Sequence, residues 1–138
     1  MSVIYVAEAV STGDGRNGHV ETSDGKVSID LAYPKEIGGS GAGSNPEQLV
    51  AMGYAACFSS ALGVVARQHH LTLTGVEVTC KTNLHRDGDA FALTFEITAH
   101  LPGLDPEQAD AIVAEAHTVC PYSKAFAHGV DTRARATT

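Results

Sequence analysis

The stretch Gly38–His70 reads GGSGAGSNPEQLVAMGYAACFSSALGVVARQHH, and it decides the fold. It opens as a glycine-rich loop and continues as a predicted helix that is apolar nearly all round between Leu49 and Ala66. Such a helix is expected to be buried on several sides, so the rest of the chain should pack around it. One thiol, Cys57, lies in the middle of this apolar run.

The start of this helix can be placed in two ways. Ser44 followed by Glu47 matches a capping box, in which the two side chains bond each other's backbone N–H groups. The competing frame puts Asn45 at the N-cap and Pro46 at the first helical position. Both frames place Glu47 in the first turn of the helix.

Alternating apolar residues predict strands on both sides of the central helix. The predicted strands cover residues 3–10, 20–22, 27–31, 73–84, 90–100 and 130–136. Asp24-Gly25 and Asp87-Gly88 predict the turns of two hairpins. A second helix is expected from Asp105, as N-cap, to Cys120-Pro121, followed by one more turn near residues 122–127. This order predicts an α+β fold with mostly antiparallel sheets, in one domain spanning residues 1–138.

The composition limits the classes of function. Of the 138 residues, 43% are hydrophobic and 18% are charged, which indicates a packed core. The 9 basic and 16 acidic residues give a net charge of −7, which argues against a nucleic-acid partner. No run of 18 apolar residues occurs and the first residues lack a basic segment, so we expect neither a membrane span nor a signal peptide. The expected location is the cytoplasm.

The three cysteines, Cys57, Cys80 and Cys120, are too widely spaced for a zinc site or a structural disulfide framework. Cys80 shares a predicted strand face with apolar residues and is expected to be inert. The seven histidines form no metal-binding motif, and the glycine-rich loop lacks the lysine of a phosphate-binding loop. We therefore expect no bound metal or cofactor.

Cys57 taken alone could be a packing residue, but three features favour a nucleophile. Cys120 ends a helix beside a proline, where a thiol can move and where the negative helix end disfavours a thiolate. A thiol in mid-helix needs a cation to ionise, and Arg16 lies in a mobile glycine-rich loop. Glu47 could hold Arg16 with a bidentate pair. We interpret Cys57 as an attacking nucleophile and Cys120 as its resolving partner.

Helix geometry limits how these groups meet. Glu47 and Cys57 are ten positions apart in the sequence, which corresponds to about 15 Å along one straight helix. Either the helix breaks near Gly53, or Glu47 serves the Cys57 of a second subunit. The second alternative fits a helix too apolar to be covered by one chain, and it predicts a dimer.

Three motifs carry a resemblance that covers nearly the whole chain: NPEQL at residues 45–49, GYAACF at 53–58 and VCPYSK at 119–124. At these residues the chain closely resembles the organic hydroperoxide resistance (Ohr) branch of the OsmC/Ohr family. Val50 departs from the family, which often has phenylalanine there, and this difference could alter the lining of a substrate pocket. The resemblance implies an intertwined homodimer with antiparallel sheets around long buried central helices.

The resemblance also implies an activity. Family members of this branch are thiol peroxidases that prefer organic and fatty-acid hydroperoxides, and a dihydrolipoyl group, often on a lipoylated protein, reduces them again. Their roles carry over to Cys57 as the peroxidatic cysteine, Cys120 as the resolving cysteine, and Arg16 with Glu47 as the activating pair. Two alternatives stay open: an OsmC-branch peroxidase with a broader peroxide range, and a non-catalytic ligand-binding dimer whose thiols are incidental.

Overall fold

A computed structural model of the chain describes every residue from Met1 to Thr138. It divides into two compact units, Met1–Leu49 and Val50–Thr138. Both sheets are antiparallel and three α-helices accompany them, which confirms the predicted α+β class.

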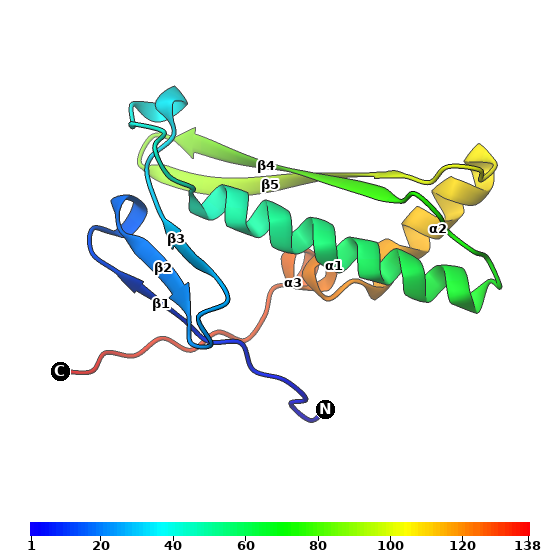
Figure 1. Ribbon diagram of the computed structural model, residues 1–138, viewed down its shortest axis with the longest axis horizontal. Helices are drawn as coiled ribbons and strands as arrows, with labels where there is room; N and C mark the ends of the chain where they lie inside the picture. The colour runs from blue at the N-terminus through cyan, green and yellow to red at the C-terminus, as the bar shows by residue number, and fades with distance from the viewer. The chain divides into compact units, whose positions relative to one another are not determined.

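The first unit holds a three-stranded sheet in the order β1-β2-β3, drawn in blue in Figure 1. Its strands are β1 (Ala9–Thr12), β2 (His19–Thr22) and β3 (Ser28–Asp30). Two short 3-10 helices, η1 (Gly15–Asn17) and η2 (Lys35–Ile37), interrupt the connections. The loop that carries Arg16 is therefore a fixed helical turn.

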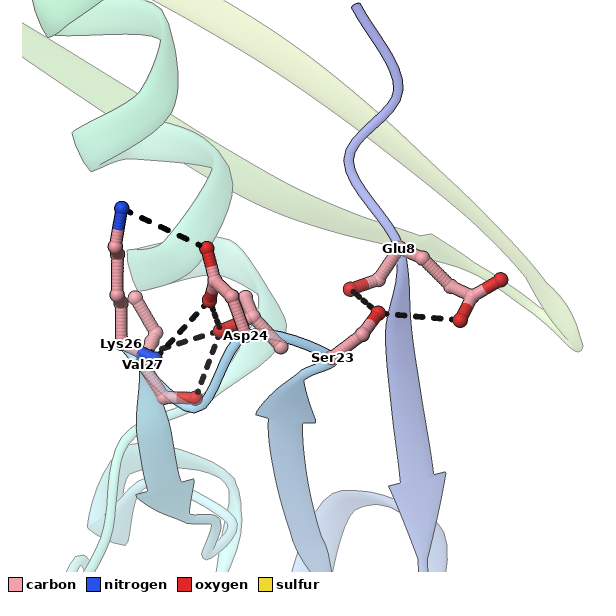
Figure 2. Close-up of polar contacts among 6 residues, drawn as sticks. Glu8, Ser23, Asp24, Lys26 and Val27 are labelled. Carbon is pink, nitrogen blue, oxygen red and sulfur yellow. Dashed lines mark hydrogen bonds and ion pairs between the residues drawn. The ribbon is translucent and has the colours of Figure 1, made fainter.

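The β2–β3 hairpin is built around the predicted Asp-Gly turn (Figure 2). The Asp24 carboxylate accepts hydrogen bonds from the Thr22 hydroxyl at 2.7 Å and from the Lys26 backbone N–H at 3.0 Å. Gly25 has a φ of 71°, a conformation that glycine adopts without a steric cost. Ser23 ties the turn to the incoming chain, because its hydroxyl donates to the Glu8 carbonyl at 2.9 Å.

The longest helix, α1 (Pro46–Gln68), runs without interruption into the second unit. That unit also contains the long hairpin β4 (Glu77–Asp87) and β5 (Ala90–His100), followed by α2 (Pro106–Val119) and α3 (Pro121–His128). Figure 1 shows the hairpin as a two-stranded ribbon in green. The register pairs Cys80 with Ile97 and Leu84 with Leu93, so the predicted apolar faces of the two strands coincide.

The core of the second unit lies where α1 meets α2 and the β4–β5 hairpin. Phe58 and Leu62 of α1 are at most 1% exposed, and Ala116 of α2 is fully buried. Apolar residues of the β4–β5 hairpin, Cys80 and Ile97 among them, pack against this cluster. Burying one such large side chain stabilises the fold by about 1.5–3 kcal/mol. This cluster therefore holds α1, and with it Cys57, in place within the second unit.

The capping residues decide between the two frames for α1. The side chain of Asn45 accepts a hydrogen bond from the Gln48 backbone N–H at 2.9 Å, so the Asn45 frame is confirmed. The Ser44 hydroxyl instead donates to the Gln48 side chain at 2.8 Å, so the capping box with Glu47 is wrong. Glu47 therefore does not cap the helix, and its carboxylate can bind another side chain.

The predicted terminal strands are wrong in this single chain. β1 begins only at Ala9, and residues 130–136 form no strand. Ile4 is 96% exposed and Val130 is 68% exposed. A strand requires a neighbour to pair its backbone N–H and C=O groups, and residues 3–7 and 130–136 have none here. The strand predicted from residue 73 likewise begins only at Glu77.

By length and composition alone, α1 is apolar enough to cross a membrane, with a mean hydropathy of 1.8 over its most apolar window. Core helices of water-soluble proteins meet the same test, so this property decides nothing about a membrane. Only a third of that window is buried in the chain, and Met52 is 57% exposed. Apolar surface of α1 is therefore left uncovered.

Candidate active site

The first element of the candidate site is an ion pair within the first unit. Arg16, in η1, donates from Nη1 to Glu47 Oε2 at 2.7 Å and from Nη2 to Glu47 Oε1 at 2.6 Å. This is the bidentate geometry that a guanidinium and a carboxylate form most strongly. The Arg16 guanidinium also lies over the Tyr33 ring, 5.9 Å from its centroid. Both contacts hold the positive charge in one orientation.

The pair shifts both pKa values in the direction that keeps both groups charged. The hydrogen bonds from Arg16 lower the pKa of Glu47, and the same bonds raise the pKa of Arg16. The Arg16 side chain is 31% exposed and the Glu47 side chain 15%. The arginine therefore stays cationic at neutral pH and well above it.

The lowered pKa of Glu47 predicts how stability changes with pH. A carboxyl group with a depressed pKa contributes its full stabilisation above the ordinary value of about 4.3, and loses it as the pH falls through the lowered value. We expect Glu47→Gln to destabilise the protein near neutral pH and to matter less near about pH 3. Urea denaturation of both proteins at each pH measures this. An equal difference in the free energy of unfolding at both pH values would contradict the pairing.

The second element is a pair of free cysteines in the second unit. Cys57 Sγ and Cys120 Sγ are 3.5 Å apart, although 63 residues separate them in the sequence. Cys120 is 0% exposed and Cys57 is partly buried. An approach of about 1.5 Å would bring the two sulfurs to disulfide distance. The arrangement can therefore form and open a disulfide without rearranging the fold.

Cys120 occupies a junction that the sequence predicts only in part. It is the C-cap of α2, as expected, and at the same time the N-cap of α3. Because α3 is a complete helix of 8 residues rather than one turn, its positive end lies at Cys120 and opposes the negative end of α2. Both helix ends therefore act on the Cys120 thiol, and the negative end of α2 does not act alone. Pro121 at the first helical position is the signal that could have revealed this helix.

Three influences set the pKa of Cys57. Burial is the largest and raises the pKa, and the neighbouring Cys120 thiol raises it further. The backbone N–H of Tyr122, in the first turn of α3, hydrogen-bonds the sulfur and lowers the pKa. The net shift is upward, so the chain alone favours the neutral thiol. Full activation requires a further positive charge near this sulfur.

Aromatic side chains of α1 and α3, close in sequence to the two cysteines, pack against one another. Tyr54 stacks on Tyr122 with their ring centroids 5.8 Å apart, and its hydroxyl lies 2.9 Å from the buried Ser123 hydroxyl. Gly53 makes room for this packing, since a Cβ there would lie 2.8 Å from the Tyr122 hydroxyl oxygen. Gly53 is therefore needed for packing inside a continuous helix. The alternative in which a break near Gly53 brings Glu47 and Cys57 of one chain together is excluded.

Known proteins share this sequence and this fold. The model of the OsmC-like protein family matches residues 39–135. The chain belongs to this family. Over 131 residues it is 40% identical to an organic hydroperoxide resistance protein of Xanthomonas axonopodis pv. citri. The alignment covers 94% of this chain and 92% of the relative. The resemblance stated from the sequence motifs is thereby confirmed.

Solved structures of family members agree. An organic hydroperoxide resistance protein from Legionella pneumophila superposes with a TM-score of 0.86 at 46% identity, covering 94% of this chain and 95% of that one. OhrB of Bacillus subtilis superposes with a TM-score of 0.82 at 35% identity, covering 94% of this chain and 96% of that one. A Vibrio cholerae relative, with captopril bound in one of its active sites, superposes with a TM-score of 0.86 at 46% identity. The match covers 95% of this chain and 90% of that one. The family is one of organic hydroperoxide resistance, which indicates an oxidoreductase of the peroxidase type.

The third cysteine of this family member lies apart from the pair. Cys80, on β4, is partly buried, and its sulfur is 3.9 Å from the Thr82 hydroxyl. Burial raises its pKa, which keeps the thiol neutral and unreactive. Cys80 therefore offers a matched control for every experiment on Cys57.

Proposed function

We propose that the chain is a thiol-dependent peroxidase that reduces organic hydroperoxides, alkyl and fatty-acid, to alcohols in the cytoplasm. The observation that carries the proposal is the 3.5 Å separation of the Cys57 and Cys120 sulfurs. Relatives named for organic hydroperoxide resistance support the substrate class. Aromatic rings beside the thiols fit an alkyl or aryl peroxide better than hydrogen peroxide, because they can bury apolar substrate surface.

The reaction proceeds in three steps. The Cys57 thiolate attacks the terminal oxygen of ROOH, the O–O bond breaks, and the released alkoxide takes a proton and leaves as ROH. Cys57 is then a sulfenic acid, which Cys120 attacks, forming the disulfide and releasing water. A dithiol reductant, which we propose to be dihydrolipoamide or a lipoylated protein, opens the disulfide by exchange and becomes a disulfide itself.

Arg16 and Glu47 supply the positive charge in this proposal. Because α1 is continuous, Glu47 and Cys57 of one chain are about 15 Å apart along its axis. We therefore assign the Arg16–Glu47 pair to the Cys57 of a second copy. The guanidinium, held by its carboxylate, would stabilise the thiolate that burial disfavours.

A homodimer also accounts for the unpaired segments. Residues 3–6 are strongly exposed although they have the composition of a strand, and α1 leaves apolar surface uncovered. Pairing with a second copy would satisfy the backbone of such a segment and bury its side chains. This dimer would complete two sites, each built from both chains.

The substrate and the reductant are tested together by steady-state turnover. We expect faster consumption of cumene hydroperoxide than of hydrogen peroxide, and support by dihydrolipoamide but not by thioredoxin. The Cys80→Ser protein serves as the reference, since it removes a thiol that takes no part in the reaction. Equal rates with both peroxides would argue for the OsmC-branch alternative, and no turnover with any donor would contradict the proposal.

The sharing of the site between two chains is tested by mixing two inactive variants. Cys57→Ser and Arg16→Ala chains are unfolded together and refolded at equal amounts. Half of the randomly assorted dimers then carry one complete site of two, so we expect about a quarter of the wild-type activity. If each chain uses its own Arg16, the mixed dimers gain nothing over the Arg16→Ala protein alone.

A further inference from the structure

The Arg16 guanidinium has two partners in the first unit, and only one of them, Glu47, is charged. The carboxylate occupies one edge of the planar cation, because it accepts one hydrogen bond from Nη1 and one from Nη2. A guanidinium has five N–H donors, so three remain for another anion. The second partner is Tyr33, since Arg16 Cζ lies over its ring, 5.9 Å from the centroid. The side of the cation that faces this ring is closed to other groups.

The backbone of Tyr33 is bonded on two sides. Its N–H donates to Asn17 Oδ1 at 3.3 Å, and its carbonyl oxygen accepts from the Gly41 N–H at 3.0 Å. Asn17 follows Arg16 in η1, so the turn that carries the guanidinium also binds Tyr33. Gly39 lies so close that a Cβ there would overlap the carbonyl oxygen and the Cβ of Tyr33. These contacts fix the point from which the ring projects toward the guanidinium.

The segment that ends at Tyr33 also supports the chain that leads to Glu47. The Ala32 N–H donates to the Ser44 carbonyl at 2.9 Å, and the Ser44 N–H donates to the Asp30 carbonyl at 3.0 Å. Ser44 lies two residues before α1, which carries Glu47 in its first turn. The segment is therefore bonded both to the turn of the arginine and to the chain of its carboxylate.

We propose that Tyr33 is a positioning residue that holds the Arg16 guanidinium in the orientation in which it stabilises the Cys57 thiolate of a second copy. The face of an aromatic ring is negative and attracts a cation. A long side chain with a single partner keeps rotational freedom, and a second contact removes part of it. This inference rests on the proposed function, because Tyr33 acts only through the role of Arg16 there.

The test compares three side chains at position 33 in the full-length protein. Tyr33→Leu removes the ring, Tyr33→Phe keeps it, and the wild type is the reference. Each protein reacts with iodoacetamide over a range of pH, and alkylation of the Cys57 peptide is followed by mass spectrometry.

We expect Tyr33→Leu to slow the alkylation of Cys57 near neutral pH and to move its pH profile to higher pH. Tyr33 is 38% exposed, so the strength of an exposed cation–π contact applies, and it corresponds to a slowing of about two- to fivefold. Tyr33→Phe should react nearly as fast as the wild type, because the ring remains. Equal rates for Tyr33→Leu and Tyr33→Phe would overturn the proposal.

The β4–β5 hairpin offers a matched control. Arg86 Cζ lies over the Phe91 ring, 5.8 Å from its centroid, in a contact of the same kind that the mechanism does not use. Phe91→Leu should leave the alkylation of Cys57 unchanged. A slowing as large as that of Tyr33→Leu would show that the effect is not specific to Arg16, and would overturn the proposal.

Two further measurements separate an action through the cation from packing. In an Arg16→Ala background, Tyr33→Leu should slow alkylation no further, because the ring has no cation to hold. Phenylalanines with one, two and three ring fluorines at position 33 should slow alkylation stepwise, since fluorine weakens the negative ring face at nearly constant shape. Additional slowing in the Arg16→Ala background, or equal rates along the fluorine series, would overturn the proposal.

The same experiments distinguish this inference from the proposed function. Slower alkylation in Arg16→Ala together with unchanged alkylation in Tyr33→Leu refutes the role of Tyr33 alone. Unchanged alkylation in Arg16→Ala refutes the role of Arg16 and this inference with it. Absent peroxide turnover in the wild type refutes the proposed function.

Discussion

Replacing Cys57 by serine is expected to reduce organic hydroperoxide turnover to the uncatalysed background, a loss on the order of a thousandfold or more. The serine hydroxyl does not ionise near neutral pH, so it cannot replace the thiolate as nucleophile toward the O–O bond. The side chain changes by one atom in a partly buried position, so the fold should survive. Consumption of cumene hydroperoxide with dihydrolipoamide as donor measures the effect.

Cys80→Ser is the matched control for that result. It makes the same chemical change at another partly buried cysteine, whose sulfur contacts only the Thr82 hydroxyl among polar side chains. We expect turnover within about twofold of the wild type, because surface and half-buried substitutions of this size rarely perturb a distant site. Turnover retained by Cys57→Ser would instead support the non-catalytic ligand-binding alternative.

Replacing Cys120 by serine is expected to uncouple oxidation from turnover. Cys57 should still react once with a hydroperoxide, because its own sulfur is intact. The sulfenic acid then has no thiol at 3.5 Å to condense with, so the disulfide that a dithiol reductant opens cannot form. We expect one equivalent of peroxide to be consumed rapidly, followed by a loss of dihydrolipoamide-dependent turnover of about a hundredfold or more.

Two measurements separate this outcome from simple unfolding. A sulfenic-acid probe such as dimedone should label Cys57 in the Cys120→Ser protein and label it much less in the wild type. With excess peroxide, the variant should pass to sulfinic and sulfonic acids, since nothing protects its sulfenic acid. Wild-type turnover by Cys120→Ser would show that the resolving thiol comes from elsewhere.

The sequence predicts the locally determined parts of the fold. The Asp24-Gly25 turn, the Asn45 cap and the Asp87-Gly88 turn each follow from a few neighbouring residues. Such features depend on backbone geometry that is set within a few residues, so they hold whatever surrounds them.

Features that depend on partners distant in the sequence are harder to predict from the sequence. Of the strands predicted at residues 3–10 and 130–136, only Ala9 and Val10 are in a strand. Strand pairing needs a neighbour, and the pattern of alternating residues does not say which chain supplies it. The 3.5 Å approach of the Cys57 and Cys120 sulfurs joins α1 to the junction of α2 and α3, and no local motif encodes it. The Arg16–Glu47 bidentate pair spans 31 positions, and the sequence points to it only through the need of a thiol for a cation and through the family resemblance.

The central claim is tested most directly by mapping the disulfide that one equivalent of cumene hydroperoxide forms. Cleavage after lysine and arginine places Cys57 in residues 36–67, Cys80 in residues 68–81 and Cys120 in residues 87–124, so the three thiols fall on separate peptides. After the remaining thiols are alkylated, the account predicts that the peptides of Cys57 and Cys120 are linked and that Cys80 is alkylated. A link through Cys80, or peroxide consumed while Cys57 and Cys120 both remain free for alkylation, would contradict it.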